Sequence, residues 1–168
     1  MGSRGRRRAS QRGSSIVEKG SIADLTIRGA SGLYKFMKKT QARRNLPETF
    51  VSIVSAIEAF KPARRYKNEF PYQTDLRGWL HAKFGSAEIE VQKGRSRPDI
   101  VIGEVAIEVK GPTANRDLIT IADKINRYSQ HFERMIVVLF AVSVSKNLYD
   151  EWLRGITKQY PGVAIVRK

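Results

Sequence analysis

Two carboxylates and a lysine, Asp99, Glu108 and Lys110, flank a stretch that has the pattern of a β-hairpin. The short β-rich runs are separated only by Gly103-Glu104, which suits a two-residue type II′ turn. That turn places Asp99 opposite Glu108, with Cβ atoms about 4.5–5.5 Å apart. Because side chains alternate along a strand, Glu108 and Lys110 share one face. We therefore predict that the three side chains converge on one side of the hairpin.

Like charges that face each other across a sheet are destabilising, and a divalent cation between them reverses the sign of that energy. Carboxylates select hard cations, so Mg²⁺ is the expected ion and Mn²⁺ its substitute. Such an ion polarises a phosphate oxygen and lowers the pKa of water. The carbonyl of Val109 is expected as a further metal ligand. The Lys110 ammonium can orient the attacking water or stabilise developing negative charge.

The motif Pro98-Asp99, two apolar residues, a short gap and Ile107-Glu108-Val109-Lys110-Gly111 resembles the PD-(D/E)xK phosphodiesterase superfamily. The resemblance covers roughly residues 69–144. It implies a restriction-endonuclease-like αβββαβ core with a mixed central sheet between helices. It also implies a Mg²⁺-dependent DNA endonuclease, often a homodimer, with branched DNA or a restriction-like duplex as substrate.

Relatives in that superfamily usually add an acid from the helix before the first strand, and both Glu69 and Asp75 are candidates. At 100° per residue, Glu69 falls near the Leu76 and Leu80 stripe that faces the sheet, whereas Asp75 lies to its flank. We favour Glu69. An acid that only complements the helix dipole is the competing interpretation.

Hydrophobic periodicity from residue 69 onward predicts the order α-β-β-β-α-β-α-β in an α/β domain. The expected helices are 71–84, 117–132 and 146–159, and the expected strands are 87–93, 99–102, 105–110, 135–143 and 163–166. Arg95 and Arg97 flank the hairpin and are candidate phosphate contacts. Lys124 is expected on a solvated helix face.

The N-terminal part of the chain carries most of the net charge of +15. Residues 1–68 hold 16 Lys and Arg against 4 Asp and Glu, whereas the remainder holds 15 against 12. Residues 1–15 are interpreted as a disordered basic tail, with an organelle transit peptide as the alternative. Residues 16–68 are interpreted as a basic helical extension and a possible DNA-binding arm, ahead of a nuclease-like domain at 69–168.

Two helices are expected in this extension. The first, 31–44, carries candidate nucleic-acid contacts at Lys38, Lys39, Arg43 and Arg44. The second begins with Asn45 as N-cap and Glu48 three residues later. The pair could be a helix-turn-helix relative or an extension packed on the core.

The composition narrows the remaining classes of protein. There is no cysteine, which removes disulfides and thiolate zinc sites, and no apolar run reaches the length of a membrane span. We expect a soluble intracellular protein, cytoplasmic or nucleoid-associated, that binds DNA, uses no small-molecule cofactor and needs no membrane. A non-catalytic nucleic-acid-binding or assembly protein on the same fold, or an RNA-associated basic protein, stays open.

Overall fold

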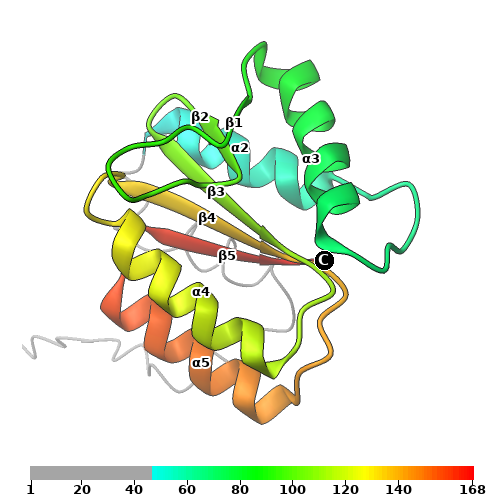
Figure 1. The fold of residues 1–168 in the computed structure, drawn as a ribbon, viewed down its shortest axis with the longest axis vertical. Coiled ribbons are helices and arrows are strands. Elements are labelled where there is room, and N and C mark those ends of the chain that lie inside the picture. Colours follow the sequence, from blue (N-terminus) through cyan, green and yellow to red (C-terminus); the bar gives the residue numbers. More distant parts are fainter. Residues whose placement is uncertain (1–46) are drawn as a thin grey trace, which may run out of the picture.

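Five strands form one mixed sheet in the order β1-β2-β3-β4-β5 in the computed structural model, which describes residues 47–168 (Figure 1). The strands are β1 (Glu88–Ile89), β2 (Ile100–Ile102), β3 (Val105–Lys110), β4 (Arg134–Leu139) and β5 (Val163–Arg167). The helices are α2 (Glu48–Ala59), α3 (Glu69–Phe84), α4 (Asn115–Tyr128) and α5 (Lys146–Gln159). β1, β2 and β3 pair antiparallel, whereas β3, β4 and β5 pair parallel. The α/β class and the element order predicted from residue 69 onward are confirmed.

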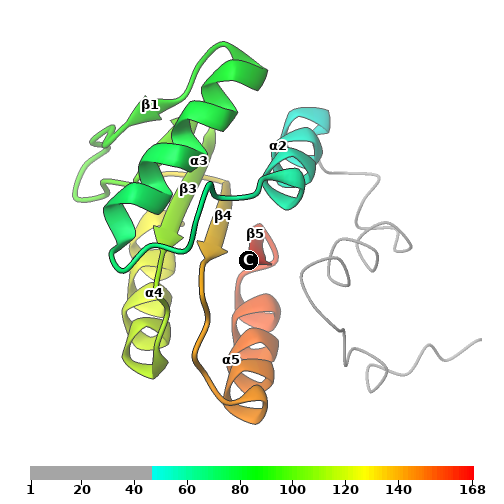
Figure 2. The same ribbon diagram turned by 90° about the vertical axis from the view of Figure 1, so that its right-hand side faces the viewer.

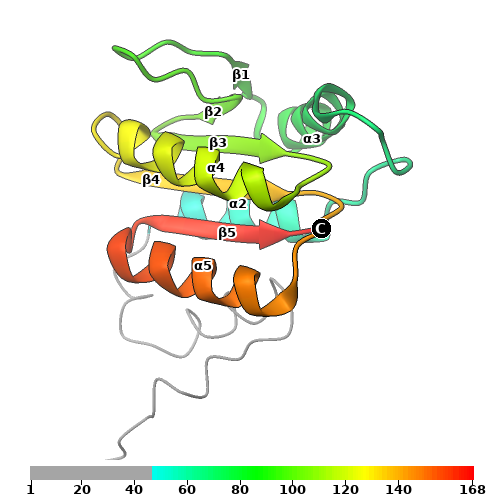
Figure 3. The ribbon, with the colours of Figure 1, turned by 60° about the horizontal axis from the view of Figure 1, so that its bottom comes forward.

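Helices cover both faces of the sheet, with α2 and α3 on one face and α4 and α5 on the other (Figures 1 and 3). β4 lies between β3 and β5, and its side chains alternate between two cores. Ile136 and Val138 pack under α2 and α3, and Met135 and Val137 pack under α4 and α5. Helices thus cover both faces of the strand expected at 135–143, which is usual for a parallel strand inside a sheet.

The predicted hairpin register is confirmed. Ile100 pairs with Ile107, and Ile102 pairs with Val105 on either side of the turn. Gly103 has φ 56°, a left-handed conformation that glycine adopts without steric cost. This turn sets which β3 side chains face α4, and hence where the charged residues lie.

α2 shares a core with the sheet. Phe50, Ile53 and Ile57 are at most 1% exposed and pack in the same cluster as the β3 and β4 residues. The described part of the basic extension is therefore packed on the domain. Of the two arrangements predicted for it, this is the extension packed on the core. The predicted N-cap, Asn45, lies outside the described residues. Within residues 47–168, α2 starts at Glu48 and its N-cap is Pro47, with ψ 136°. The helix therefore begins later in the chain than the predicted N-cap, Asn45, implied.

Three predicted elements end four residues earlier in the structure than expected. The strand expected at 87–93 is reduced to two residues, because Glu90 turns out of the strand with φ 50°. The helix expected at 117–132 runs from Asn115 to Tyr128, while Phe132 still packs in the core beyond its end. The strand expected at 135–143 ends at Leu139, since Ala141 has φ 47° and redirects the chain.

Candidate active site

Asp99 immediately precedes β2 and is fixed against β3. Its Oδ2 accepts a hydrogen bond of 2.7 Å from the backbone N–H of Val109. The Gln73 side chain of α3 donates to the Asp99 carbonyl at 3.3 Å. Where the backbone pairing between β2 and β3 ends, the Asp99 carboxylate thus accepts the Val109 N–H in place of a backbone carbonyl. The N–H and C=O of one strand residue point to the same side, so the Val109 carbonyl faces the side on which Asp99 lies.

Glu108 lies in the middle of β3 and its side chain is 0% exposed. One carboxylate oxygen, Oε1, accepts a hydrogen bond from the ammonium of Lys124. The other, Oε2, is buried and has no hydrogen-bond partner among residues 47–168. Burial, and then the negative charge of Asp99, raise the pKa of Glu108 to about 7. A buried acid in this state is poised between its neutral and charged forms at neutral pH.

Lys110 ends β3 and joins two acids from different elements. Its Nζ lies 2.7 Å from Glu69 Oε2 and 3.9 Å from Glu108 Oε1. The Lys110 side chain is 15% exposed, so these charges interact in partly excluded solvent. Glu69 is the first residue of α3 and reaches the cluster from the helix entrance.

Asp75, the alternative acid, lies elsewhere. Its Oδ2 accepts a hydrogen bond of 2.5 Å from the Tyr66 hydroxyl and one of 3.4 Å from the Ala63 N–H. Asp75 therefore anchors the loop between α2 and α3. Of the two candidates, Glu69 is the one that contacts Lys110.

Lys124 was missed, and its expected place on a solvated face is wrong. It projects from α4 onto Glu108 and its side chain is 25% exposed. Burial works to lower the pKa of Lys124, but the charges of Glu108, Asp99 and Glu69 outweigh it and raise that pKa. The sequence did hold a signal. On α4, Lys124 lies at about 60° from Ile121, on the flank of the apolar stripe that ends at Tyr128.

Tyr128 closes the cluster from one helical turn further along α4. Its hydroxyl donates a 2.8 Å hydrogen bond to the carbonyl of Arg97, which ties α4 to the segment before Asp99. Burial, together with the charges of Glu108 and Asp99, raises the pKa of Tyr128 well above its usual range. The phenol is therefore a neutral hydrogen-bond donor at physiological pH.

The two predicted phosphate contacts that the structure describes, Arg95 and Arg97, do not join this cluster. The Arg97 guanidinium pairs with Glu90 and is exposed, and Arg95 is exposed as well. Lys38, Lys39, Arg43 and Arg44 lie outside the described residues.

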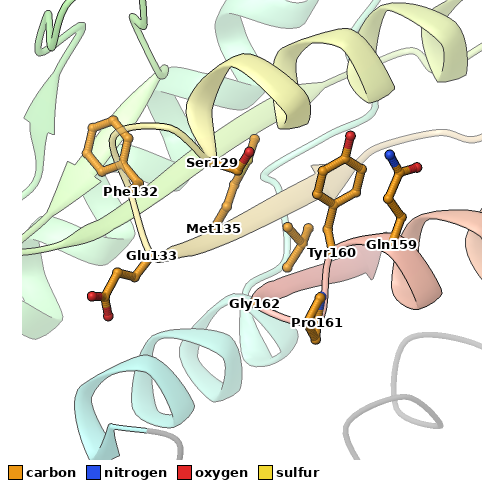
Figure 4. A pocket seen from close by; sticks show the side chains of 9 residues that line it. Ser129, Phe132, Glu133, Met135, Gln159, Tyr160, Pro161 and Gly162 are labelled. Carbon is orange, nitrogen blue, oxygen red and sulfur yellow. The ribbon is translucent and has the colours of Figure 1, made fainter.

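The cluster is distinct from the pocket drawn in Figure 4, which is lined in part by Glu133, Met135, Tyr160 and Gly162 (Figure 4). Met135 and Val163 lie at the starts of the parallel strands β4 and β5, whereas Lys110 ends β3. The pocket and the charged cluster therefore lie at opposite ends of the sheet.

The charged cluster brings three carboxylates, from Glu69, Asp99 and Glu108, next to two ammonium groups, from Lys110 and Lys124. Burial is also the main reason that the pKa of Asp99 is raised. Within residues 47–168, no group of three or more His, Cys, Asp or Glu side chains is arranged to hold a metal ion by itself. The arrangement offers the buried carboxylate of Glu108 and the half-buried carboxylate of Asp99 as acceptors, and two ammonium groups that can stabilise an anion.

Comparisons with protein-family models, with curated proteins and with solved structures found no match for this chain. No helix within residues 47–168 has the length and apolar character needed to cross a bilayer. The fold and the geometry of the site define an α/β domain with a mixed five-stranded sheet and a charged cluster at the C-terminal end of β3.

Proposed function

We propose that the chain is a metal-dependent endonuclease that hydrolyses phosphodiester bonds in DNA, on a restriction-endonuclease-like core of the PD-(D/E)xK type. The observation that carries the proposal is the placement of Asp99 and Glu108. Burial raises the pKa of both carboxyl groups, and the negative charge of Asp99 raises the pKa of Glu108 further, beside Lys110. Holding a buried carboxylate next to a second acid costs stability, and strongly perturbed acids of this kind concentrate at functional sites.

A hard divalent cation fits these residues. Mg²⁺ keeps several waters and is usually bound through only one or two carboxylates, so a cluster of three acids is not required. The buried Glu108 Oε2 has no hydrogen-bond partner among residues 47–168, and the Asp99 carboxylate and Val109 carbonyl would complete the oxygen ligands. When bound, Mg²⁺ or Mn²⁺ would supply Lewis-acid polarisation of a phosphate oxygen and a lowered pKa for water.

The chain's own residues have separable roles in this proposal. Glu108 gives up its proton, which a pKa of about 7 allows at neutral pH. Lys110 places a positive charge where negative charge develops on the phosphate, and it can orient the attacking water. Glu69 positions the Lys110 ammonium through the 2.7 Å ion pair. Lys124 holds the Glu108 carboxylate in place.

The substrate and assembly state follow from charge and resemblance. A net charge of +15 favours a polyanion, and we propose DNA, either branched or a restriction-like duplex. Cutting both strands of a duplex needs two active sites, so we propose a homodimer. We place the protein in the cytoplasm or on the nucleoid, where such DNA is found.

One observation favours a second function, a non-catalytic nucleic-acid-binding protein on the same fold. Lys110 and Lys124 already pair with Glu69 and Glu108 inside the chain. If these ion pairs only hold α3 and α4 to the sheet, the cluster stabilises the fold and does not catalyse a reaction. The two functions differ in whether the bound DNA is cut.

The test is incubation of the purified protein with supercoiled plasmid and with a labelled four-way junction in Mg²⁺, Mn²⁺ or EDTA. Cutting that requires metal and is lost in Asp99→Ala and Lys110→Ala supports the nuclease. Tight, salt-sensitive binding of DNA without cutting supports the non-catalytic nucleic-acid-binding protein. A parallel RNA substrate separates DNA from RNA.

A further inference from the structure

A second site lies at the end of the sheet where β3, β4 and β5 terminate. A pocket of about 520 Å³ opens between the loop that joins α2 to α3 and the C-terminal residues. Figures 1 and 2 show this loop and the C-terminus on the same side of the molecule, the right-hand side in Figure 1 (Figures 1 and 2). Arg64 and Arg65 line the pocket from the loop, and Arg167 and Lys168 line it from the end of the chain.

Within the described part of the chain, the arginines of this pocket form no ion pair, whereas the negative charge of Glu58 acts on Lys168. No Asp or Glu lines the pocket, and Arg64, Arg65 and Arg167 make no ion pair within 4.0 Å to any residue in 47–168. Lys168 is held in place, since its Nζ donates a 2.7 Å hydrogen bond to the Glu58 carbonyl. Arginines that line one pocket without acidic partners attract an anion.

The loop that carries two of the arginines is pre-organised. The Tyr66 N–H donates to the Tyr72 hydroxyl at 2.9 Å, and the Tyr66 hydroxyl donates to Asp75 at 2.5 Å. The Arg64 guanidinium lies 5.4 Å from the centre of the Tyr66 ring. Asp75 therefore fixes the place of Arg64 through Tyr66. A binding group held in advance loses less entropy when its ligand arrives.

The pocket adjoins the end of β3 that carries Lys110 of the charged cluster. Phe140 lines the pocket, and its N–H donates a 2.7 Å hydrogen bond to the carbonyl of Lys110. Tyr72 also lines the pocket and lies one turn of α3 after Glu69. A ligand that extends from the charged cluster around the end of the sheet would reach these arginines.

We infer that this pocket binds a phosphate group of the nucleic-acid backbone, next to the phosphodiester at the charged cluster. The inference rests on the proposed function for the identity of its ligand. Phosphate suits the arginines because a guanidinium can donate two parallel hydrogen bonds to it. The pocket at the other end of the sheet carries Glu133 and no Lys or Arg among its lining residues, so it lacks this chemistry.

The test compares two variants of equal charge in the full chain. The pocket variant is Arg64→Gln with Arg167→Gln, and the control is Arg154→Gln with Lys158→Gln, which are exposed on the C-terminal half of α5. Binding of a labelled duplex and a labelled four-way junction is measured in EDTA over a range of salt. Removing one phosphate contact lowers the slope of log K against log[salt] by about 1 and weakens binding at low salt on the order of tenfold.

A third variant distinguishes phosphate binding in an ordered pocket from general attraction by net charge. Asp75→Ala releases the loop while raising the net charge by one. General attraction predicts tighter DNA binding by this variant, whereas the pocket predicts weaker binding. Circular dichroism and thermal melts establish that each variant is folded before its binding is compared.

The outcomes separate this inference from the proposed nuclease. Weaker binding and a lower slope in the pocket variant alone support the pocket, even if no DNA is cut by any form of the protein. Equal DNA binding by the pocket and control variants overturns the inference that the pocket binds phosphate, even if the parent protein cuts DNA. Absence of any nucleic-acid binding, or binding to anionic vesicles in its place, also overturns it.

Discussion

The Lys110 ammonium lies 2.7 Å from the Glu69 carboxylate, although the two residues are 41 positions apart in the chain. The contact joins the end of β3 to the start of α3, and it holds Lys110 beside Glu108. Since Glu69 touches Lys110 and not the carboxylate pair, its role in the proposed reaction is to position the ammonium.

Glu69→Gln is expected to lower the single-turnover rate of DNA cleavage by about 10- to 100-fold, because Lys110 then loses its anchor. The cost in stability should stay below about 1 kcal/mol, since Glu69 is partly exposed. Glu104→Gln is the matched control, because it removes the exposed ion pair with Lys93. Equal cleavage rates in the two variants would remove Glu69 from the site.

At pH 9, where Glu108 is ionised, Lys124→Met is expected to destabilise the fold by roughly 2–3 kcal/mol, because it leaves this buried carboxylate without its ammonium partner. Adding Glu108→Gln in the same chain should recover part of that loss, since the unpaired charge is then gone. The measurement is urea unfolding of both single variants and the double variant. Lys146→Met is the control, because Lys146 forms an exposed pair with Asp150 on α5. Additive effects of the two site substitutions would show that the Lys124–Glu108 pair contributes nothing.

The stability of the metal-free protein should depend on the protonation of Glu108. Its pKa rises from 4.5 to about 7 in the folded state, because of burial and the charge of Asp99. An acid with a raised folded pKa stabilises the fold fully below about pH 4.5, and this contribution is lost as pH rises through about 7. The free energy of unfolding is expected to fall by up to about 3 kcal/mol across that window.

Glu108→Gln should flatten this dependence, since glutamine does not titrate. The two proteins can be compared by urea unfolding from pH 4.5 to 8 in EDTA. A wild-type curve parallel to that of the variant would mean that Glu108 does not carry the effect.

Gly111→Ala is expected to destabilise the protein by about 1–3 kcal/mol. A Cβ at this position would lie 2.7 Å from the Phe140 Cβ and 3.0 Å from the Tyr72 ring. The matched control, Gly155→Ala, meets nothing within 4 Å on α5 and should stabilise by up to about 1 kcal/mol. Thermal melts of both variants measure the difference. Two variants with the same melting temperature would contradict this close packing beside Lys110.

The hairpin and the helices were accessible from sequence because their signals are local. Gly103-Glu104 sets the register of β2 against β3, and the alternation of side chains along β3 predicts that Glu108 and Lys110 share a face. α5 matched its predicted bounds, 146–159, because its apolar spacing and its flanking residues agree.

The parts that sequence reasoning missed depend on contacts between distant elements. The pairing of Lys124 with Glu108 requires the angle at which α4 crosses β3, which periodicity does not contain. The left-handed conformations of Glu90 and Ala141 end strands that their residue types favour. The anchoring of the α2–α3 loop by Asp75 likewise depends on how that loop folds back on α3.

The measurement that most directly tests the central claim is single-turnover cleavage of supercoiled plasmid and of a four-way junction by Asp99→Asn in Mg²⁺. The control is Asp123→Asn, which removes an exposed carboxylate that pairs with Arg127 at 3.2 Å on α4. Asp99→Asn is expected to lose about 1,000-fold or more in rate while binding DNA in EDTA as the wild type does, and the control is expected to cut normally. Equal cleavage by both variants, or no metal-dependent cleavage by the wild type, would contradict the assignment of this cluster as a nuclease site.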